Sequence, residues 1–143
     1  MFHIRQCKAN DFDTVILLLR QLWTDKTVDP TLLRPIFERG LASSSKMYLV
    51  AMDENQVVGF GSLSLKDDLW PEGQVAYIDE LIVNSEYRSK GIGAQLLNHL
   101  IATAREKGCY RIELTCAFSR TDAHGFYKHN DFASRAYVFS KVL

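Results

Sequence analysis

Alternating apolar and polar residues predict six β-strands along the chain. β-branched and aromatic side chains dominate these stretches, and turn residues such as Gly, Pro, Asn and Asp separate them. The predicted strands cover residues 2–7, 47–52, 57–65, 74–83, 110–117 and 137–142. A turn at 53–56 joins the second and third strands as a hairpin, and Gly59 and Gly61 in the third indicate a bulge or close packing.

Apolar residues at helical spacing predict four helices between these strands. They cover residues 11–22, 31–41, 92–104 and 121–130, the second weakened by Pro35. We expect Asn10 to cap the first helix, Thr121 to cap the fourth, and Gly108 to be left-handed after the third. The element order is therefore β-α-α-β-β-β-α-β-α-β, an α/β fold with a mixed, mostly antiparallel sheet flanked by helices.

Composition narrows the class of protein. A length of 143 residues predicts one domain over 1–143, and 17 basic against 17 acidic residues give no excess charge for nucleic acid. Apolar runs are too short to span a membrane, and charged residues near the start argue against a signal peptide. Cys7, Cys109 and Cys116 are odd in number and lack metal-ligand spacing, which favours buried thiols in a reducing cytoplasm.

A glycine-containing loop, Arg88-Ser89-Lys90-Gly91-Ile92-Gly93, joins the fourth predicted strand to the third predicted helix. The first N–H groups of a helix have no partner within it, and the helix dipole adds positive charge there, so such a junction favours anions. The glycines let a phosphate approach the backbone, and Arg88 and Lys90 add full charges. Neither a Walker loop nor the three-glycine dinucleotide fingerprint is present. The loop predicts a pyrophosphate site, with a purely structural turn as the alternative.

Two motifs resemble those of the GCN5-related N-acetyltransferases, the GNAT family. The loop has the family's Arg-x-x-Gly-x-Gly pattern for acetyl-CoA, and Ala123 with Phe126-Tyr127 looks like its C-terminal Ala-x-x-Phe-Tyr segment. Asp131-Phe132 stands where the family usually has Gly-Phe. The motifs lie in the family's order, one helix and one strand apart. The resemblance implies the GNAT fold, with acetyl-CoA as co-substrate.

The resemblance also implies a set of cofactor-binding residues. Backbone groups of the strand before the loop would hold the pantetheine arm, and the backbone of residues 88–93 would hold the pyrophosphate. Arg120 replaces an Asn that contacts the pantetheine in many members, so the contact there departs from the pattern. The full set is Leu81, Ile82, Val83, Arg88, Ser89, Lys90, Gly91, Ile92, Gly93, Arg120 and Tyr127.

Acetyl transfer to an amine needs a base for the ammonium proton and an acid for the departing thiolate. Asp79 and Glu80 lie on the strand before the loop, and alternation points them to opposite faces unless a bulge alters the parity. By resemblance we expect Glu80 to be the base, with a solvated or salt-bridged carboxylate as the alternative. We expect Tyr127 to be the acid, or else a core tyrosine, and the Val83 N–H to meet the oxyanion.

Acceptor contacts are less defined. The candidates are Trp23, Asp79 and His124, and Trp70, Asp67 and Asp68 are weaker ones; each also has a purely structural interpretation. The four histidines form no ligand cluster, so we expect no metal.

The segment from Arg120 to Tyr127 and the terminal Phe139-x-Lys141-x-Leu143 look most like the aminoalkylphosphonate N-acetyltransferase branch. That branch acts on short amines with an anionic group, for which Arg120 and Lys66 are conceivable partners. Polyamine, aminoglycoside or protein acetylation remain alternatives, as does an acyl-CoA sensor without turnover. The resemblance further implies a homodimer, and we expect neither nucleic acid nor membrane as a partner.

Overall fold

The computed structural model describes residues 1–143 and forms two compact units, Met1–Glu113 and Leu114–Leu143. The strands are β1 (Phe2–Gln6), β2 (Lys46–Asp53), β3 (Gln56–Asp68), β4 (Gly73–Val83) and β5 (Ile112–Leu114). The α-helices are α1 (Phe12–Leu22), α2 (Pro30–Ala42), α3 (Ile92–Glu106) and α4 (Thr121–His129), and two 3₁₀ turns cover Ala9–Asp11 and Ser85–Tyr87.

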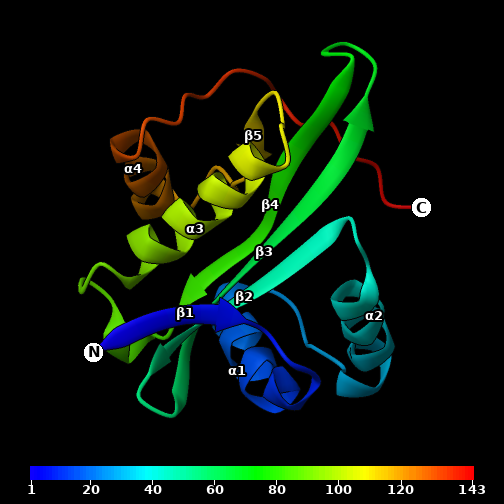
Figure 1. The fold of residues 1–143 in the computed structure, drawn as a ribbon. Helices are drawn as coiled ribbons and strands as arrows, with labels where there is room; N and C mark the ends of the chain where they lie inside the picture. Colours follow the sequence, from blue (N-terminus) through cyan, green and yellow to red (C-terminus); the bar gives the residue numbers. More distant parts are fainter. The chain divides into compact units, whose positions relative to one another are not determined.

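The strands form one sheet in the order β1-β2-β3-β4-β5, and β1 to β4 are antiparallel neighbours (Figure 1). The predicted mixed sheet flanked by helices is thus confirmed. Helix α3 lies against one face so closely that a Cβ on Gly59 would be 3.0 Å from the Leu96 side chain. A Cβ on Gly61 would be 3.3 Å from Leu100, so these glycines allow α3 to approach β3. The close packing predicted for them is present.

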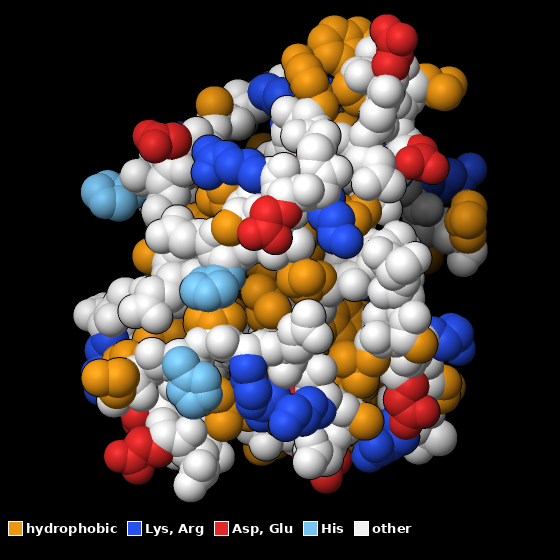
Figure 2. Space-filling view, in the orientation of Figure 1, with side chains coloured by type: hydrophobic (Ala, Val, Ile, Leu, Met, Phe, Trp, Pro, Cys, Tyr) orange, Lys and Arg blue, Asp and Glu red, His pale blue; other side chains and the backbone are white.

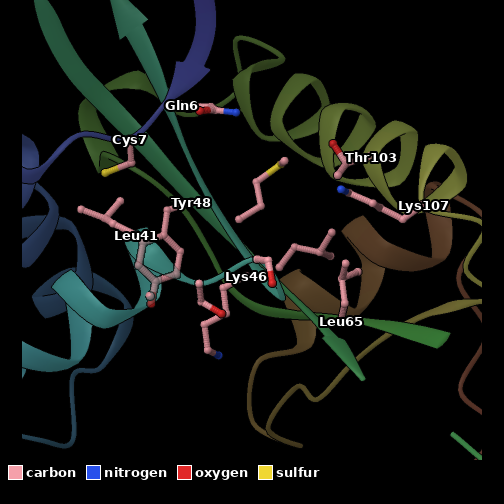
Figure 3. A pocket seen from close by; sticks show the side chains of 13 residues that line it. Gln6, Cys7, Leu41, Lys46, Tyr48, Leu65, Thr103 and Lys107 are labelled. Atoms are coloured by element: carbon pink, nitrogen blue, oxygen red, sulfur yellow. The ribbon is translucent and has the colours of Figure 1, made fainter. Parts of the chain in front are cut away.

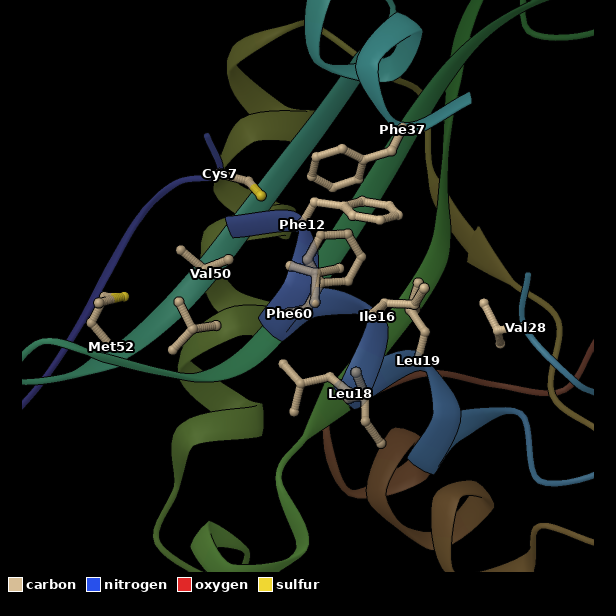
Figure 4. Close-up of a cluster of buried hydrophobic side chains, with 13 residues drawn as sticks. Cys7, Phe12, Ile16, Leu18, Leu19, Val28, Phe37, Val50, Met52 and Phe60 are labelled. Atoms are coloured by element: carbon tan, nitrogen blue, oxygen red, sulfur yellow. The ribbon is translucent and has the colours of Figure 1, made fainter. Parts of the chain in front are cut away.

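Helices α1 and α2 cover the opposite face of the sheet and enclose the main core (Figure 4). The apolar stripe of α1 is buried as its spacing predicted, and Phe12 meets Phe37 of α2 edge-on, with ring centroids 5.2 Å apart. Phe60 of β3 belongs to the same cluster and is 2% exposed. Because adjacent β3 residues face opposite sides, Phe60 points toward α1 and α2 while Gly59 and Gly61 face α3.

The start of α1 differs from the prediction. Asn10 lies inside the turn Ala9–Asp11 and caps nothing; Asp11 occupies the N-cap position. The Asp11 carboxylate instead accepts two hydrogen bonds from Arg5, at 2.8 and 2.9 Å, and one from the Lys8 N–H at 2.7 Å. These bonds, led by those from Arg5, lower the pKa of Asp11. The carboxylate therefore ties β1 to the start of α1.

Other boundaries shift for local reasons. Helix α2 begins earlier than predicted because Asp29 accepts a hydrogen bond from the Thr31 N–H at 2.9 Å, and it continues through Pro35. Strand β3 extends to Asp68 rather than ending at the predicted residue 65, so only residues 69–72 separate it from β4. The strand predicted at 110–117 forms only at β5. At α4 the N-cap is Arg120, and Thr121 is already helical, so Thr121 does not cap.

The strand predicted at 137–142 is wrong for this chain: residues 133–143 contain no regular secondary structure. Tyr137, Phe139 and Val142 are 78%, 93% and 98% exposed. Alternating apolar residues form a strand only where a neighbouring strand accepts their backbone hydrogen bonds, and no strand pairs with this segment.

None of the helices has the combination of length and apolar character needed to cross a membrane. On the face shown in Figure 2, Lys and Arg side chains alternate with Asp and Glu without a large patch of one sign. This mixture agrees with the formal net charge of zero.

Candidate active site

An irregularity in β4 determines where its two carboxylates point. The register between β3 and β4 pairs Ser62 with Glu80 but Leu63 with Ile78, so Asp79 is an extra residue opposite β3. Such a bulge breaks the strict alternation of side chains. Asp79 and Glu80 both line one cavity, so the bulge alters the parity that strict alternation would have given them.

This cavity, called here the carboxylate cavity, has a volume of about 250 Å³. Helices α1 and α2 supply an apolar wall, and strands β2, β3 and β4 supply the rest. Its lining consists of Leu19, Trp23, Leu33, Ile36, Phe37, Lys46, Tyr48, Phe60, Asp79 and Glu80. Trp23, an expected acceptor contact, is among these residues. The cavity therefore combines an apolar wall with two carboxylates, one ammonium and one phenol.

Glu80 is held by a single neighbour on β3. Ser62, which is fully buried, donates to Glu80 Oε1 at 2.6 Å, and its Oγ accepts the Glu80 N–H at 2.9 Å. Burial raises the pKa of Glu80, Asp79 nearby raises it further, and Ser62 and Lys46 oppose the shift. A carboxylate with a raised pKa is a better proton acceptor than an exposed one, provided that it is ionised at the working pH.

Lys46, at the start of β2, is a cation in the same cavity that sequence reasoning missed. Its Nζ donates to Ser64 Oγ at 2.9 Å and lies 3.9 Å from Asp79 Oδ2, and Ser64 in turn donates to Asp79. The side chains of Lys46 and Asp79 are 41% and 37% exposed. The pair is therefore open to solvent and weakly held, since exposed ion pairs contribute little.

Tyr48 separates the carboxylate cavity from a second hollow. Its ring packs between Phe37 and Phe60, with centroid distances of 5.5 and 5.6 Å. A Cβ on Gly40 would lie 2.0 Å from the Tyr48 hydroxyl, so the glycine makes room for the phenol. Burial, and then Glu80, raise the pKa of Tyr48.

The second hollow, of about 240 Å³, opens at the end of β1 (Figure 3). It shares Lys46 and Tyr48 with the carboxylate cavity, but no Asp or Glu lines it. Burial raises the pKa of Cys7 in its wall to about 12, so this thiol stays protonated and is a poor nucleophile at neutral pH. A site that must remove a proton from an amine is better placed in the carboxylate cavity.

The predicted pyrophosphate loop has the backbone geometry that an anion site needs. Ser89 and Gly91 are both left-handed, with φ of 64° and 81°, and Gly91 is the N-cap of α3 without any side-chain cap. The first N–H groups of α3 are thus not capped by a side chain. A Cβ on Gly91 would have no atom within 4 Å, and the charged residues Arg88 and Lys90 are exposed beside it. These residues fit a pyrophosphate.

Near the end of β4, some backbone N–H groups point away from β3. The Asn84 N–H donates to the Val58 carbonyl at 2.8 Å, and Val83 is opposite Gly59. Because hydrogen bonds alternate along an antiparallel pair, the N–H groups of Leu81 and Val83 point away from β3. By the same alternation, the polar backbone groups of Ile82 face β3. The Val83 carbonyl also accepts a hydrogen bond from Arg88 Nε at 3.1 Å.

In the second unit, the phenol of Tyr127 on α4 packs among aromatic rings. Phe126 and Phe132 are edge-on to it, with centroids 5.2 and 5.6 Å away. Burial raises the pKa of Tyr127 to about 12; Cys116 adds to the shift and Arg120 opposes it. The phenol therefore carries its proton at neutral pH.

Several other predicted residues lie elsewhere. His124 Nε2 donates to the Ala117 carbonyl at 2.8 Å, which favours the structural interpretation of this histidine. Trp70 is 71% exposed and packs on Tyr110 with a centroid distance of 5.5 Å. Within the first unit, Lys66, Asp67, Asp68 and Trp70 do not line the carboxylate cavity.

The acetyltransferase (GNAT) family model matches residues 13–132, most of the chain. The chain belongs to the GNAT family. It is 30% identical to the aminoalkylphosphonate N-acetyltransferase of Salmonella typhimurium over 140 residues, which cover 98% of this chain and 90% of that protein. Acetyl-CoA is the acetyl donor of this family, so the protein is an acetyl-CoA-dependent N-acetyltransferase.

A further relative and a solved structure also resemble the chain. Glucosamine 6-phosphate N-acetyltransferase 1 of Oryza sativa subsp. japonica is 26% identical, over 94% of this chain and 82% of that protein. A crystal structure of an aminoglycoside N-acetyltransferase in complex with CoA superposes with a TM-score of 0.88 and 18% identity. It covers 100% of this chain and 95% of that one, and at this identity it shows the fold alone.

Proposed function

We propose that this GNAT enzyme transfers acetyl directly to the primary amine of a small molecule that also carries an anionic group. The observation that carries the proposal is the carboxylate cavity, where Glu80 and Asp79 face the same space as Lys46. An acceptor with an ammonium and an anion can meet opposite charges at both ends. The volume of about 250 Å³ suits a short acceptor.

The relatives support the same class of acceptor. The Salmonella protein is named for aminoalkylphosphonates and the rice protein for glucosamine 6-phosphate. Both acceptors combine an amine with a phosphorus oxyanion. Lys46 takes the role for which the sequence had suggested Lys66 or Arg120.

Glu80 is the general base of the proposed reaction. An alkylammonium has a pKa of about 10.4, so an acceptor arrives protonated at neutral pH and must lose one proton before it attacks. The raised pKa of Glu80 brings its basicity closer to this task. Burial also removes the water that would otherwise solvate its charge.

Acetyl-CoA, when bound, supplies the acetyl group as a thioester. The residues 88–93 and the α3 amides would hold the pyrophosphate, and the outward N–H of Leu81 would bind the pantetheine arm. The Val83 N–H would donate a hydrogen bond to the oxygen of the acetyl group. Tyr127 would supply the proton that the CoA sulfur needs; its motif supports this role, and its raised pKa keeps the phenol protonated at neutral pH.

Polycations are the second candidate acceptors, because two carboxylates share the cavity. Release of free CoA should be measured with matched acceptors: a short aminoalkylphosphonate, an alkylamine of the same length, a polyamine, an aminoglycoside and a peptide. We expect the highest kcat/KM for the aminoalkylphosphonate. Turnover of the peptide or the polyamine alone would contradict the proposal, and turnover of none would favour a non-catalytic acyl-CoA sensor.

A further inference from the structure

We infer that Ser62 is the positioning residue of the base: its hydroxyl fixes the Glu80 carboxylate in the carboxylate cavity and keeps it ionised. This inference rests on the proposed role of Glu80. Ser62 lies on β3 directly opposite the bulge, at the position that pairs with Glu80. It is the fully buried polar residue in a stretch of β3 that is otherwise apolar.

The Ser62 hydroxyl forms hydrogen bonds with both the backbone and the side chain of Glu80. Ser62 Oγ accepts the Glu80 N–H at 2.9 Å and donates its own proton to Glu80 Oε1 at 2.6 Å. The backbone bond fixes the residue at the bulge, and the short bond fixes the carboxylate. A side chain held at two points loses little further freedom when it meets an acceptor.

The direction of the two bonds favours the charged carboxylate. An N–H group only donates, so the Ser62 oxygen must accept from Glu80 N and its hydroxyl proton remains to be donated. The acceptor that receives this proton is Glu80 Oε1. If Glu80 were protonated on that oxygen, two donors would face each other. Oε1 therefore carries no proton, and the bond donated to it is stronger when the carboxylate is ionised, the state a base requires.

The other charged and titratable groups in the cavity act in both directions. Asp79 on β4 disfavours the charge on Glu80, and Lys46 on β2 favours it. Tyr48 on β2 is neutral near pH 7, and the lining residues from α1 and α2 carry no charge. Ser62 is thus the neutral hydrogen-bond donor that offsets the burial of Glu80, and Lys46 adds a partly exposed charge.

The test is the pH dependence of kcat/KM for Ser62→Ala, with Ser64→Ala as the matched control. Ser64 lies two residues along β3 on the same face and donates to Asp79 instead. Loss of a hydrogen bond to a carboxylate should raise the pKa of Glu80 by about one unit. In Ser62→Ala, the acidic limb of the kcat/KM profile should therefore move to higher pH by about one unit. On that limb, kcat/KM should be about tenfold lower than in the parent. In Ser64→Ala, the acidic limb should stay at the parent's pH. In Ser62→Thr, which keeps the hydroxyl, it should also lie at the parent's pH.

A second readout needs no turnover. Titration of the Glu80 side-chain carboxyl by ¹³C NMR, in the protein alone, should show the same rise in Ser62→Ala; if that variant does not fold, Ser62→Cys replaces it. An unchanged Glu80 pKa would overturn the inference. If Glu80→Gln keeps the parent's acidic limb, the proposed base is wrong. If Glu80→Gln removes that limb and Ser62→Ala does not move it, only the inference about Ser62 fails.

Discussion

Replacing Glu80 by glutamine should slow acetyl transfer at neutral pH in a way that high pH reverses. The substitution changes charge more than shape, because the amide oxygen can still accept the hydrogen bond that Ser62 now gives Oε1 at 2.6 Å. The variant should therefore fold and bind acetyl-CoA like the parent. What it loses is the proton acceptor, and general bases contribute about 10²–10⁴-fold to the rate.

The recovery of the Glu80→Gln rate at high pH follows from the pKa of the acceptor's ammonium group. With an ammonium pKa of about 10.4, about one amine in a thousand is neutral at pH 7.4 and about one in ten at pH 9.4. The parent's advantage over Glu80→Gln should thus shrink by about a hundredfold across this interval. Initial rates of CoA release, measured as the ratio of parent to variant at each pH, give this number directly.

Two results would refute the reasoning. Turnover of Glu80→Gln at the parental rate at neutral pH would show that Glu80 is not the base. Alternatively, Asp79→Asn could show the defect that high pH reverses, and the more exposed carboxylate of the bulge would then be the base.

Three further predictions follow from the same geometry. Tyr127→Phe should lower kcat by about 10²–10⁴-fold with nearly unchanged acetyl-CoA affinity and no recovery at high pH; parental turnover would exclude Tyr127 as the acid. Acetyl-CoA should raise the melting temperature of the parent by mass action but not that of Gly93→Leu, where the side chain blocks the phosphate, and an equal shift in both would place the cofactor elsewhere. Because burial raises the pKa of Glu80, the folded state binds its proton more tightly than the unfolded state, and stability should fall as pH rises from the ordinary carboxyl range through the raised pKa. Glu80→Gln should lack this decline and melt higher at neutral pH, and a lower melting temperature there would contradict the sign.

Most elements of the first unit could be predicted from the sequence, because the spacing of their apolar residues reflects which side chains are buried. The apolar stripe of α1 and the branched residues of β4 are examples, and the left-handed Gly91 and Gly108 mark the ends of α3. The periodicity of apolar residues does not predict a strand correctly where that strand would need a neighbouring strand to pair with. Residues 137–142 alternate like a strand but have no neighbouring strand to pair with.

The candidate site was harder to predict because it depends on register. Alternation separates Asp79 from Glu80, and only the pairing of Ser62 with Glu80 and Leu63 with Ile78 brings both into one cavity. Lys46 is distant in sequence from both carboxylates and joins them through the pairing of β2 with β3. Ser62 did carry a signal: a serine within an apolar strand needs a buried hydrogen-bond partner.

The measurement that tests the central claim most directly compares two acceptors in the parent and in Lys46→Met. The acceptors are a short aminoalkylphosphonate and an alkylamine of the same length, and the quantity is the ratio of their kcat/KM values. If the carboxylate cavity binds the acceptor with its anion at Lys46, the parent should prefer the phosphonate. Lys46→Met should then lose about tenfold of that preference, the value of one charge-assisted hydrogen bond. Because Lys46 also favours the charge on Glu80, its loss affects both acceptors alike, and the ratio of the two kcat/KM values carries the test. An unchanged preference in Lys46→Met would contradict the account, because the anion would then be bound outside this cavity.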